Sequence, residues 1–363
     1  MIKSILLFLL INQVFQKSDV YFTKEISSHK MVEMLEKLNL NLQIHSGETN
    51  GKYFLRPDFL QEIYDYTQGT FIEANTAYSS KRSSTQGHKE LLEANGWSKN
   101  NRRVVIMDEN PDDDIELTVK NPQKINKNYV GGNLKNFDSC VVLSHFKGHQ
   151  MGGFGGALKQ LSIGFASQKG KTYIHSAGKY TDWHYAFSGS TSQEDFTTSM
   201  ADAASTIVDY FPKGQIGYIS VLANISQSCD CAGSSAPAPK IHDIGILAST
   251  DPVAIDRAGL DLVKSNIDTG TNDLLNQINR LKGENTVIVA EKIGIGSQDY
   301  NLINVDGDSG KTDKNNNSDD DSISDDDDKE EEEENFDPGN QKMRGFNIEI
   351  SNILILVMMI LIL

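Results

Sequence analysis

The chain has 363 residues, enough for one large domain or two ordinary ones. Hydrophobic residues make up 38% and charged residues 23%, a composition that suits a globular body and excludes a wholly disordered chain. Residues 313–337 hold fourteen Asp or Glu and two Lys, a local net charge of −12, so the formal −16 leaves only −4 for the remainder. No basic patch is left for nucleic acid, and three cysteines exclude a disulfide scaffold.

The N-terminus has the pattern of a secretory signal. Lys3 precedes a run of seven apolar residues, 5–11. A run of seven is too short to span a bilayer and is typical of the core of a signal peptide. We therefore predict a signal peptide over residues 1–18, the alternative being a buried first strand or helix.

The body, residues 19–306, alternates between helical and strand patterns. Apolar residues at helical spacing predict helices over 28–38, 57–66, 85–95, 192–211, 252–264 and 274–282. Short apolar runs predict strands over 41–44, 69–74, 102–107, 138–143, 216–222 and 244–247. This alternation predicts an α/β fold with a largely parallel sheet flanked by helices. We expect one large domain, with room for a second lobe around residues 160–240.

Polar residues follow the predicted strand 69–74. Tyr78, Lys81 and Arg82 lie where the loops of an α/β sheet gather around ligands. Lys81 or Arg82 could hold a substrate carboxylate there. These three residues are our candidates for substrate binding.

The residues after strand 138–143 are the densest in chemically useful side chains. The set comprises three histidines, one lysine and four glycines: His145, His149, His175, Lys159, Gly152, Gly153, Gly155 and Gly156. The glycines and lysine could bind phosphate through backbone N–H groups and a point charge. The histidines could ligate a metal or transfer protons. The plainer alternative is that the glycines permit close packing and the histidines are structural.

A second cluster of metal-ligating residues lies at Cys229-Asp230-Cys231. Cysteines separated by one residue strain a mutual disulfide, so we interpret Cys229 and Cys231 as candidate metal ligands. The alternative is a pair of inert or loosely oxidised thiols. Cys140 lies inside an apolar strand, and burial explains it.

Three separated motifs carry a resemblance to a known family. The segment from Ser144 to His175, the Cys229–Cys231 motif and residues 243–254 (DIGILASTDPVA) resemble, in this order, the domain-of-unknown-function 362 family. The resemblance covers about residues 20–303. Many members of that family carry a ferredoxin insert with iron–sulfur clusters. This chain lacks the insert, so we expect no ferredoxin-type cluster.

The same glycine-rich segment has a remoter similarity to the N-terminal domain of nickel-pincer lactate racemase. His149, ten residues before Lys159, and His175, sixteen residues after it, match that family's spacings. The resemblance implies an acid/base role for His149, a cofactor anchor in Lys159 and a nickel ligand in His175. The second acid/base histidine of that family has only a loose counterpart in His88.

The C-terminal region predicts a membrane attachment. Residues 307–340 are acidic and of low complexity, which predicts a disordered linker. Small residues, a polar spacer and eleven terminal apolar residues follow over 341–363, the pattern of a GPI signal, with a short transmembrane anchor as the alternative. Sequons at Asn224 and Asn316 fit a glycoprotein. Together with the N-terminal signal, these features predict a cell-surface protein of the secretory pathway.

Two classes of function follow from these patterns. The first is an enzyme, racemase- or oxidoreductase-like, that binds a metal ion or cofactor and transfers a proton or hydride on a small hydroxy acid. The second is a surface-anchored protein that binds a metal or small-molecule ligand without turnover. A redox protein with a thiol-ligated metal at Cys229 and Cys231 is a further alternative.

Overall fold

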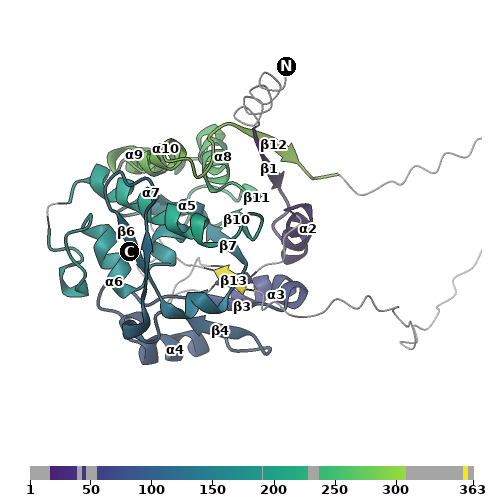
Figure 1. Ribbon diagram of the computed structural model, residues 1–363. Coiled ribbons are helices and arrows are strands. Elements are labelled where there is room, and N and C mark those ends of the chain that lie inside the picture. The colour runs from purple at the N-terminus through teal and green to yellow at the C-terminus, as the bar shows by residue number, and fades with distance from the viewer. Residues whose placement is uncertain are drawn as a thin grey trace, which may run out of the picture. The chain divides into compact units, whose positions relative to one another are not determined.

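The computed structural model describes residues 17–38, 43–45, 55–189, 191–227, 237–307 and 355–358. Its centre is a seven-stranded sheet with the order β12-β1-β11-β10-β7-β13-β2 (Figure 1). These strands are β1 (Ser18–Thr23), β2 (Gln43–His45), β7 (Cys140–His145), β10 (Ile216–Leu222), β11 (Gly245–Ser249), β12 (Tyr300–Asn304) and β13 (Ile355–Met358). Three further strand pairs are β3 (Thr70–Glu73) with β4 (Arg103–Ile106), β5 (Ile115–Thr118) with β6 (Lys127–Val130), and β8 (Lys147–His149) with β9 (Gly153–Gly155).

The sheet is mixed, which refines the prediction of a largely parallel one. β11 runs antiparallel to both of its neighbours, β1 and β10. The other ladders of this sheet are parallel, including β10 with β7, where Val221 pairs with His145. The predicted α/β class is therefore confirmed, with one reversed strand that the apolar pattern of 244–247 does not distinguish from a parallel one.

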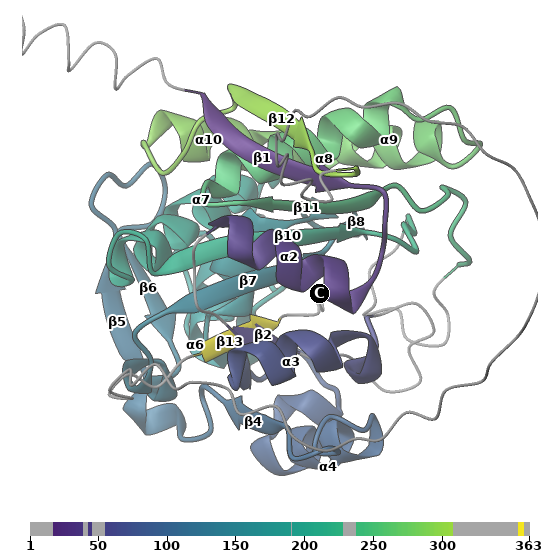
Figure 2. The ribbon, with the colours of Figure 1, turned by 90° about the vertical axis from the view of Figure 1, so that its right-hand side faces the viewer.

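Helices cover both faces of the sheet. The long helices are α2 (Ser28–Leu38), α3 (Gln61–Thr67), α4 (Thr85–Ala94), α6 (Gln168–His175), α7 (Gln193–Tyr210), α8 (Pro252–Ser265), α9 (Thr271–Arg280) and α10 (Glu284–Lys292). α2 packs on one face, as the near side of the sheet in Figure 2 shows, and α8 packs on the other. The fold is thus three layers, helix–sheet–helix.

The central strands are buried on both sides. Along β10, Tyr218 and Leu222 belong to the apolar cluster under α8, whereas Ile219 and Val221 belong to the cluster under α2. Successive side chains of a strand point to opposite faces, so a near-continuous apolar run is what two covered faces require. This is why the runs 138–143 and 216–222 could be predicted as strands from the sequence.

The body up to Asp306 forms one compact unit together with residues of the C-terminal end. Residues 160–240 do not separate from it, so the second lobe is absent from the described part of the body. The stretch Gly307–Ser351 is a unit of its own, and beyond Gly307 it lies outside the described residues.

The two ends bear on the predicted targeting segments. Residues 1–16 and the Asn316 sequon lie outside the described residues, and no helix within the described ranges is long and apolar enough to cross a bilayer. Residues 355–358, part of the predicted anchor, form β13 between β7 and β2. The same residues cannot be both a sheet strand and a cleaved or membrane-inserted tail. The mass of the mature chain distinguishes these two arrangements, and the anchor stays a prediction.

Candidate functional site

The glycine-rich segment forms a hairpin that leads into a helix. β8 and β9 pair antiparallel, with Lys147 opposite Gly155 and His149 opposite Gly153. The chain then enters the short helix α5 (Ala157–Lys159), a π-helical turn (Gln160–Gly164) and α6. π-Turns are rare and are found frequently at functional sites. Lys159 is the last residue before this turn.

Two of the glycines permit close packing. A Cβ on Gly153, whose φ is +80°, would lie 2.9 Å from Cα of Gly283. A Cβ on Gly156 would lie 2.3 Å from a carboxylate oxygen of Asp256. That carboxylate accepts the backbone N–H groups of Ala157 (2.6 Å) and Leu158 (2.9 Å). The N–H groups that a phosphate would need at the start of α5 are therefore already taken by Asp256.

Asp256 is a residue that the sequence analysis missed. It lies in α8, 98 residues beyond Leu158 along the chain, and is fully buried. Burial raises its pKa to about 7, against the lowering effect of the two N–H bonds. The signal in the sequence was an acidic residue within the apolar face of helix 252–264, between Ile255 and Ala258.

His149 stabilises the tip of the hairpin. Its Nδ1 accepts the backbone N–H groups of Met151 (3.1 Å) and Gly152 (2.9 Å). An imidazole that accepts at Nδ1 carries its proton on Nε2 when it is neutral. The ring therefore offers an N–H donor at Nε2. To act as a base, as the resemblance implies, it would have to give up the two bonds at Nδ1.

Lys159 is the least compensated charge of the site. Its side chain is buried, and its Nζ has no hydrogen-bond partner within the described part of the chain. Burial first, then the charges of Lys147 and Lys171, holds the pKa of Lys159 well below its usual range. The lowered pKa favours the neutral amine, which is a nucleophile, over the ammonium form.

Lys159 and His149 meet around Gly152. A Cβ on Gly152 would lie 3.6 Å from His149 Nδ1, 3.6 Å from Cδ of Lys159 and 3.6 Å from Sδ of Met200. These are ordinary van der Waals distances, so there is room for a small group at this point. The sequence prediction that the hairpin histidine and the lysine share one site is in this respect consistent with the geometry.

His175 lies in the last turn of α6. Its Nδ1 donates to the backbone carbonyl of Lys171 (2.7 Å), and its ring stacks on Phe196 and contacts Phe187 edge-on. Burial lowers the pKa of His175 to about 4, with the bond to the Lys171 carbonyl acting against it and the nearby Lys159 and Lys171 side chains acting with it. The neutral ring thus keeps the lone pair on Nε2, the arrangement of a metal ligand or a base whose other nitrogen is held by a carbonyl.

His145 has a structural setting at the end of β7. Its Nε2 donates to the carbonyl of Ala223 (2.6 Å), and Nζ of Lys147 lies 3.4 Å from its Nδ1. Burial, followed by the Lys147 charge, lowers the pKa of His145 to about 3. Both ring nitrogens are engaged, so this geometry disfavours the predicted role as a metal ligand.

Arg82 and His88 lie in a closed internal ion cluster. Nη2 of Arg82 donates to Glu73 (2.7 Å), and its Nε lies 3.1 Å from Nε2 of His88. His88 also contacts the second oxygen of Glu73, and its Nδ1 bonds to Asn75 (3.0 Å). All four side chains are buried. The cluster stabilises the junction of β3 and α4 and corrects our expectation of a substrate anchor and a second acid/base there.

The other predicted substrate residues do not join this cluster into a pocket. Lys81 is exposed and Tyr78 is half-buried, on the loop between β3 and α4. Cys229 and Cys231 lie outside the described residues, so their role as ligands stays a prediction. Among the described residues, no three His, Cys, Asp or Glu side chains come close enough together to hold a metal ion.

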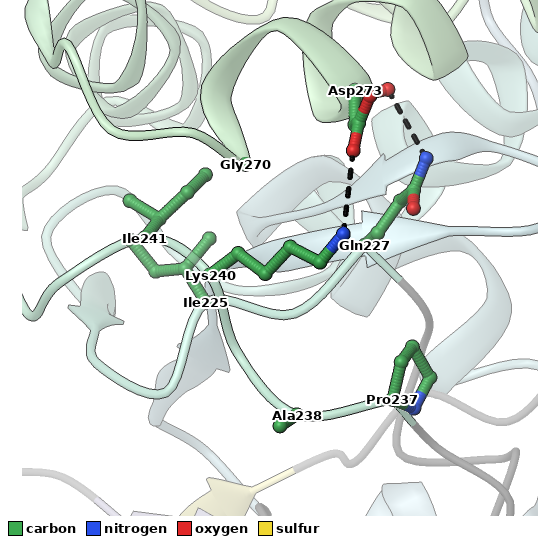
Figure 3. Close-up of a pocket in the computed structure, with 8 residues that line it drawn as sticks. All are labelled: Ile225, Gln227, Pro237, Ala238, Lys240, Ile241, Gly270 and Asp273. Carbon is green, nitrogen blue, oxygen red and sulfur yellow. Dashed lines mark hydrogen bonds and ion pairs between the residues drawn. The ribbon is translucent and has the colours of Figure 1, made fainter.

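A small pocket borders the cysteine segment (Figure 3). Lys240 and Gln227 both point toward Asp273 at the start of α9, with an ion pair of 3.7 Å and a hydrogen bond of 3.2 Å to its carbonyl. The pocket has a volume of about 60 Å³. A space of this size is small beside the about 300–1,000 Å³ typical of a ligand pocket.

The family model for Domain of unknown function (DUF362) matches residues 37–261. The chain belongs to this family. The match includes the hairpin, Lys159, His175 and Asp256, and therefore the whole candidate site. No curated protein matches the chain.

Two solved structures resemble this DUF362 protein at low identity. One is the lactate racemase apoprotein from Thermoanaerobacterium thermosaccharolyticum, with 14% identity and a TM-score of 0.40 over 67% of this chain and 56% of that one. The other is a Thermotoga maritima protein solved by structural genomics, with 12% identity and a TM-score of 0.34 over 73% and 58%. The chain spans less than two thirds of either structure.

Proposed function

We propose that the protein is an enzyme whose Lys159 amine holds a cofactor and whose reaction transfers a proton or hydride on a small hydroxy acid. The buried amine of Lys159, which has no hydrogen-bond partner among the described residues, carries the proposal. Burying a polar group without a hydrogen bond costs free energy, so a buried amine of this kind calls for an explanation, and we infer that it has a functional role. A covalently bound cofactor would convert this amine into a bonded group.

The residues around Lys159 fit a cofactor with a metal ion. His175 has its lone pair on Nε2, as a nickel ligand requires, while its Nδ1 is fixed by the Lys171 carbonyl. The resemblance implies nickel, and a cofactor of that kind would supply the hydride acceptor. Lys159 would hold it through Nζ, beside the space at Gly152.

The chain itself would orient the substrate and exclude water. The Nε2–H of His149 is a fixed donor because two backbone N–H groups hold Nδ1. It would bind an oxygen of the hydroxy acid rather than remove its proton. Phe196 and Phe187 cover the two sides of the His175 ring and reduce its access to water.

The test is the intact mass and metal content of the full chain, purified without oxygen or chelator. We expect an added mass that maps to Lys159 and disappears in Lys159→Met. Lys171→Met is the matched control, because Lys171 is also a buried lysine but donates to the Ala166 carbonyl. His175→Ala should lose the metal. A parent protein with neither adduct nor metal would overturn the proposal.

The same samples separate the alternatives. Metal lost only in Cys229→Ser would move the site to the cysteine pair and favour the redox protein. An adduct on Lys159 without racemisation or oxidation of lactate, glycerate or malate would favour a ligand-binding protein. Turnover of one of these acids that depends on Lys159 would support the enzyme.

A further inference from the structure

A second, open pocket lies apart from the Lys159 hairpin. It has a volume of about 330 Å³, large enough for a small organic molecule. Its walls come from the loop after β3, the start of α4, the loop after β4, the start of α6 and the loop before α7. The residues that matter most for its chemistry are Asn75, Thr85, Asp114, Gln168, Asp182 and Trp183.

Several hydrogen-bond donors in the pocket wall are already bonded to other groups of the protein. The amide of Asn75 donates to Thr85 and to the Asp108 carbonyl, and the amide of Gln168 donates to two backbone carbonyls. The Thr85 hydroxyl donates to the Glu109 carbonyl. The donors of these three side chains are therefore not available to a ligand, whereas the carboxylates of Asp108, Asp114 and Asp182 are acceptors in the pocket wall.

The carboxylates of the pocket differ in how they are compensated. Asp108 accepts backbone N–H groups from Asn75 (2.8 Å) and Gln168 (2.9 Å), the second at the N-terminus of α6. Asp114 accepts one bond from the Ser167 hydroxyl, while its Oδ1 is buried and has no hydrogen-bond partner among the described residues. Asp114 is thus the carboxylate that lacks full compensation.

The lysine in the pocket wall compensates Asp114 through its charge alone, without a hydrogen bond to the carboxylate. Nζ of Lys169 lies over the ring of Tyr129, 4.0 Å from its centroid. Asp182, also in the pocket wall, bonds to its neighbour His184 (2.7 Å) at the surface. The half-buried indole of Trp183 adds an aromatic face, which attracts cations.

We propose that this pocket binds a small organic cation with a primary ammonium group, with Asp114 as its counter-ion. An ammonium group has three N–H donors and no acceptor, which complements a wall of acceptors. Asp182 and Trp183 would contact the second end of a short diamine. This site is independent of the Lys159 proposal, and the failure of either leaves the other standing.

The test is calorimetric titration of the full chain with 1,4-diaminobutane, beside the neutral isostere 1,4-butanediol. We expect the diamine to bind and the diol not to bind. Asp114→Asn should weaken diamine binding about tenfold, the value of one hydrogen bond to a charged group. Asp112→Asn is the matched control, because Asp112 is exposed two residues away and does not line the pocket.

Two results would overturn the proposal. One is equal binding of the diol, which would indicate a site for neutral polyols. The other is an unchanged diamine affinity in a folded Asp114→Asn variant. If Asp114→Asn does not fold, the diamine affinity of Trp183→Ala tests the site instead, because this substitution removes the aromatic face from a partly exposed loop. We expect Trp183→Ala to weaken the diamine about threefold, and an unchanged affinity there also rejects the site.

Discussion

Two buried groups of charged residues in this molecule are handled in opposite ways. At Glu73, Arg82 and His88, a carboxylate, a guanidinium and an imidazole bond to one another. At Lys159 the nearby charges are those of lysines, and burial lowers the pKa of the amine and so favours its neutral form. A paired cluster fixes the fold, whereas a neutral buried amine is available for chemistry. The comparison explains why the predicted substrate residue Arg82 is structural and why Lys159 is the better candidate.

Breaking the paired cluster should have the largest effect on stability. Arg82→Met leaves the Glu73 carboxylate buried without its ion pair, at a cost of about 3–5 kcal/mol. Urea unfolding of the full chain measures this. Lys81→Met, next to it and exposed, should change stability by less than about 0.5 kcal/mol. Equal effects of the two substitutions would show that the cluster is not a stabilising pair.

Asp256 is a third kind of buried charged residue. Its carboxylate lies at the start of helix α5, where it accepts two backbone N–H groups. Asp256→Ala leaves the N–H groups of Ala157 and Leu158 without an acceptor, and we expect a loss of about 2 kcal/mol. Asp256→Asn keeps one acceptor and should lose less. Hydrogen exchange of the two amides locates the effect. Unchanged protection in Asp256→Ala would contradict the assigned bonds.

Many of the helices and strands could be predicted from the sequence, and the features that could not have a physical reason. Residues 28–38 and 216–222 were predicted within their observed bounds, because burial imposes a local period on helices and strands. The hairpin at Gly153 and the bond from Asp256 to Leu158 were not predicted. The strands of the hairpin are only three residues long, too short for a period to show, and the Asp256 contact joins residues 98 apart in the chain, which no local pattern records. The expectation that His149 and Lys159 belong to one site rests on the family resemblance and not on the periodicity of the sequence.

Removing the unpaired amine should have a small effect on stability and a distinct pH dependence. Lys159→Met replaces an unsatisfied polar group by an apolar one of similar length, so stability should stay within about 1 kcal/mol or rise. Because the folded pKa of Lys159 is lowered, the unfolded chain binds more protons below pH 10.5. The parent should therefore gain stability as the pH rises toward 10.5, and Lys159→Met should gain less. Parallel curves for the two proteins would mean that the amine is charged in the fold.

Asp114 is intermediate between the paired Glu73 carboxylate and the unpaired Lys159 amine. One of its oxygens is bonded, and the other has no partner in the described part of the chain. Burial raises its pKa from 3.8 to about 6; the bond from Ser167 lowers it, as do the Lys169 and Lys171 charges, while Asp108 raises it. Between pH 4 and 6 the Asp114 carboxyl is therefore protonated in the folded state and ionised in the unfolded state. Stability should fall as the pH rises through that window.

The variant Asp114→Asn isolates this contribution, since Asp256 titrates in the same direction. We expect the melting temperature of Asp114→Asn, relative to the parent, to rise between pH 4 and 6 and to be constant from pH 7 to 8. Saturating 1,4-diaminobutane should reduce this difference, because a bound ammonium group stabilises the ionised carboxylate in the fold. A difference that does not change with pH would place Asp114 with the fully compensated carboxylates and remove the reason for a cation in its pocket.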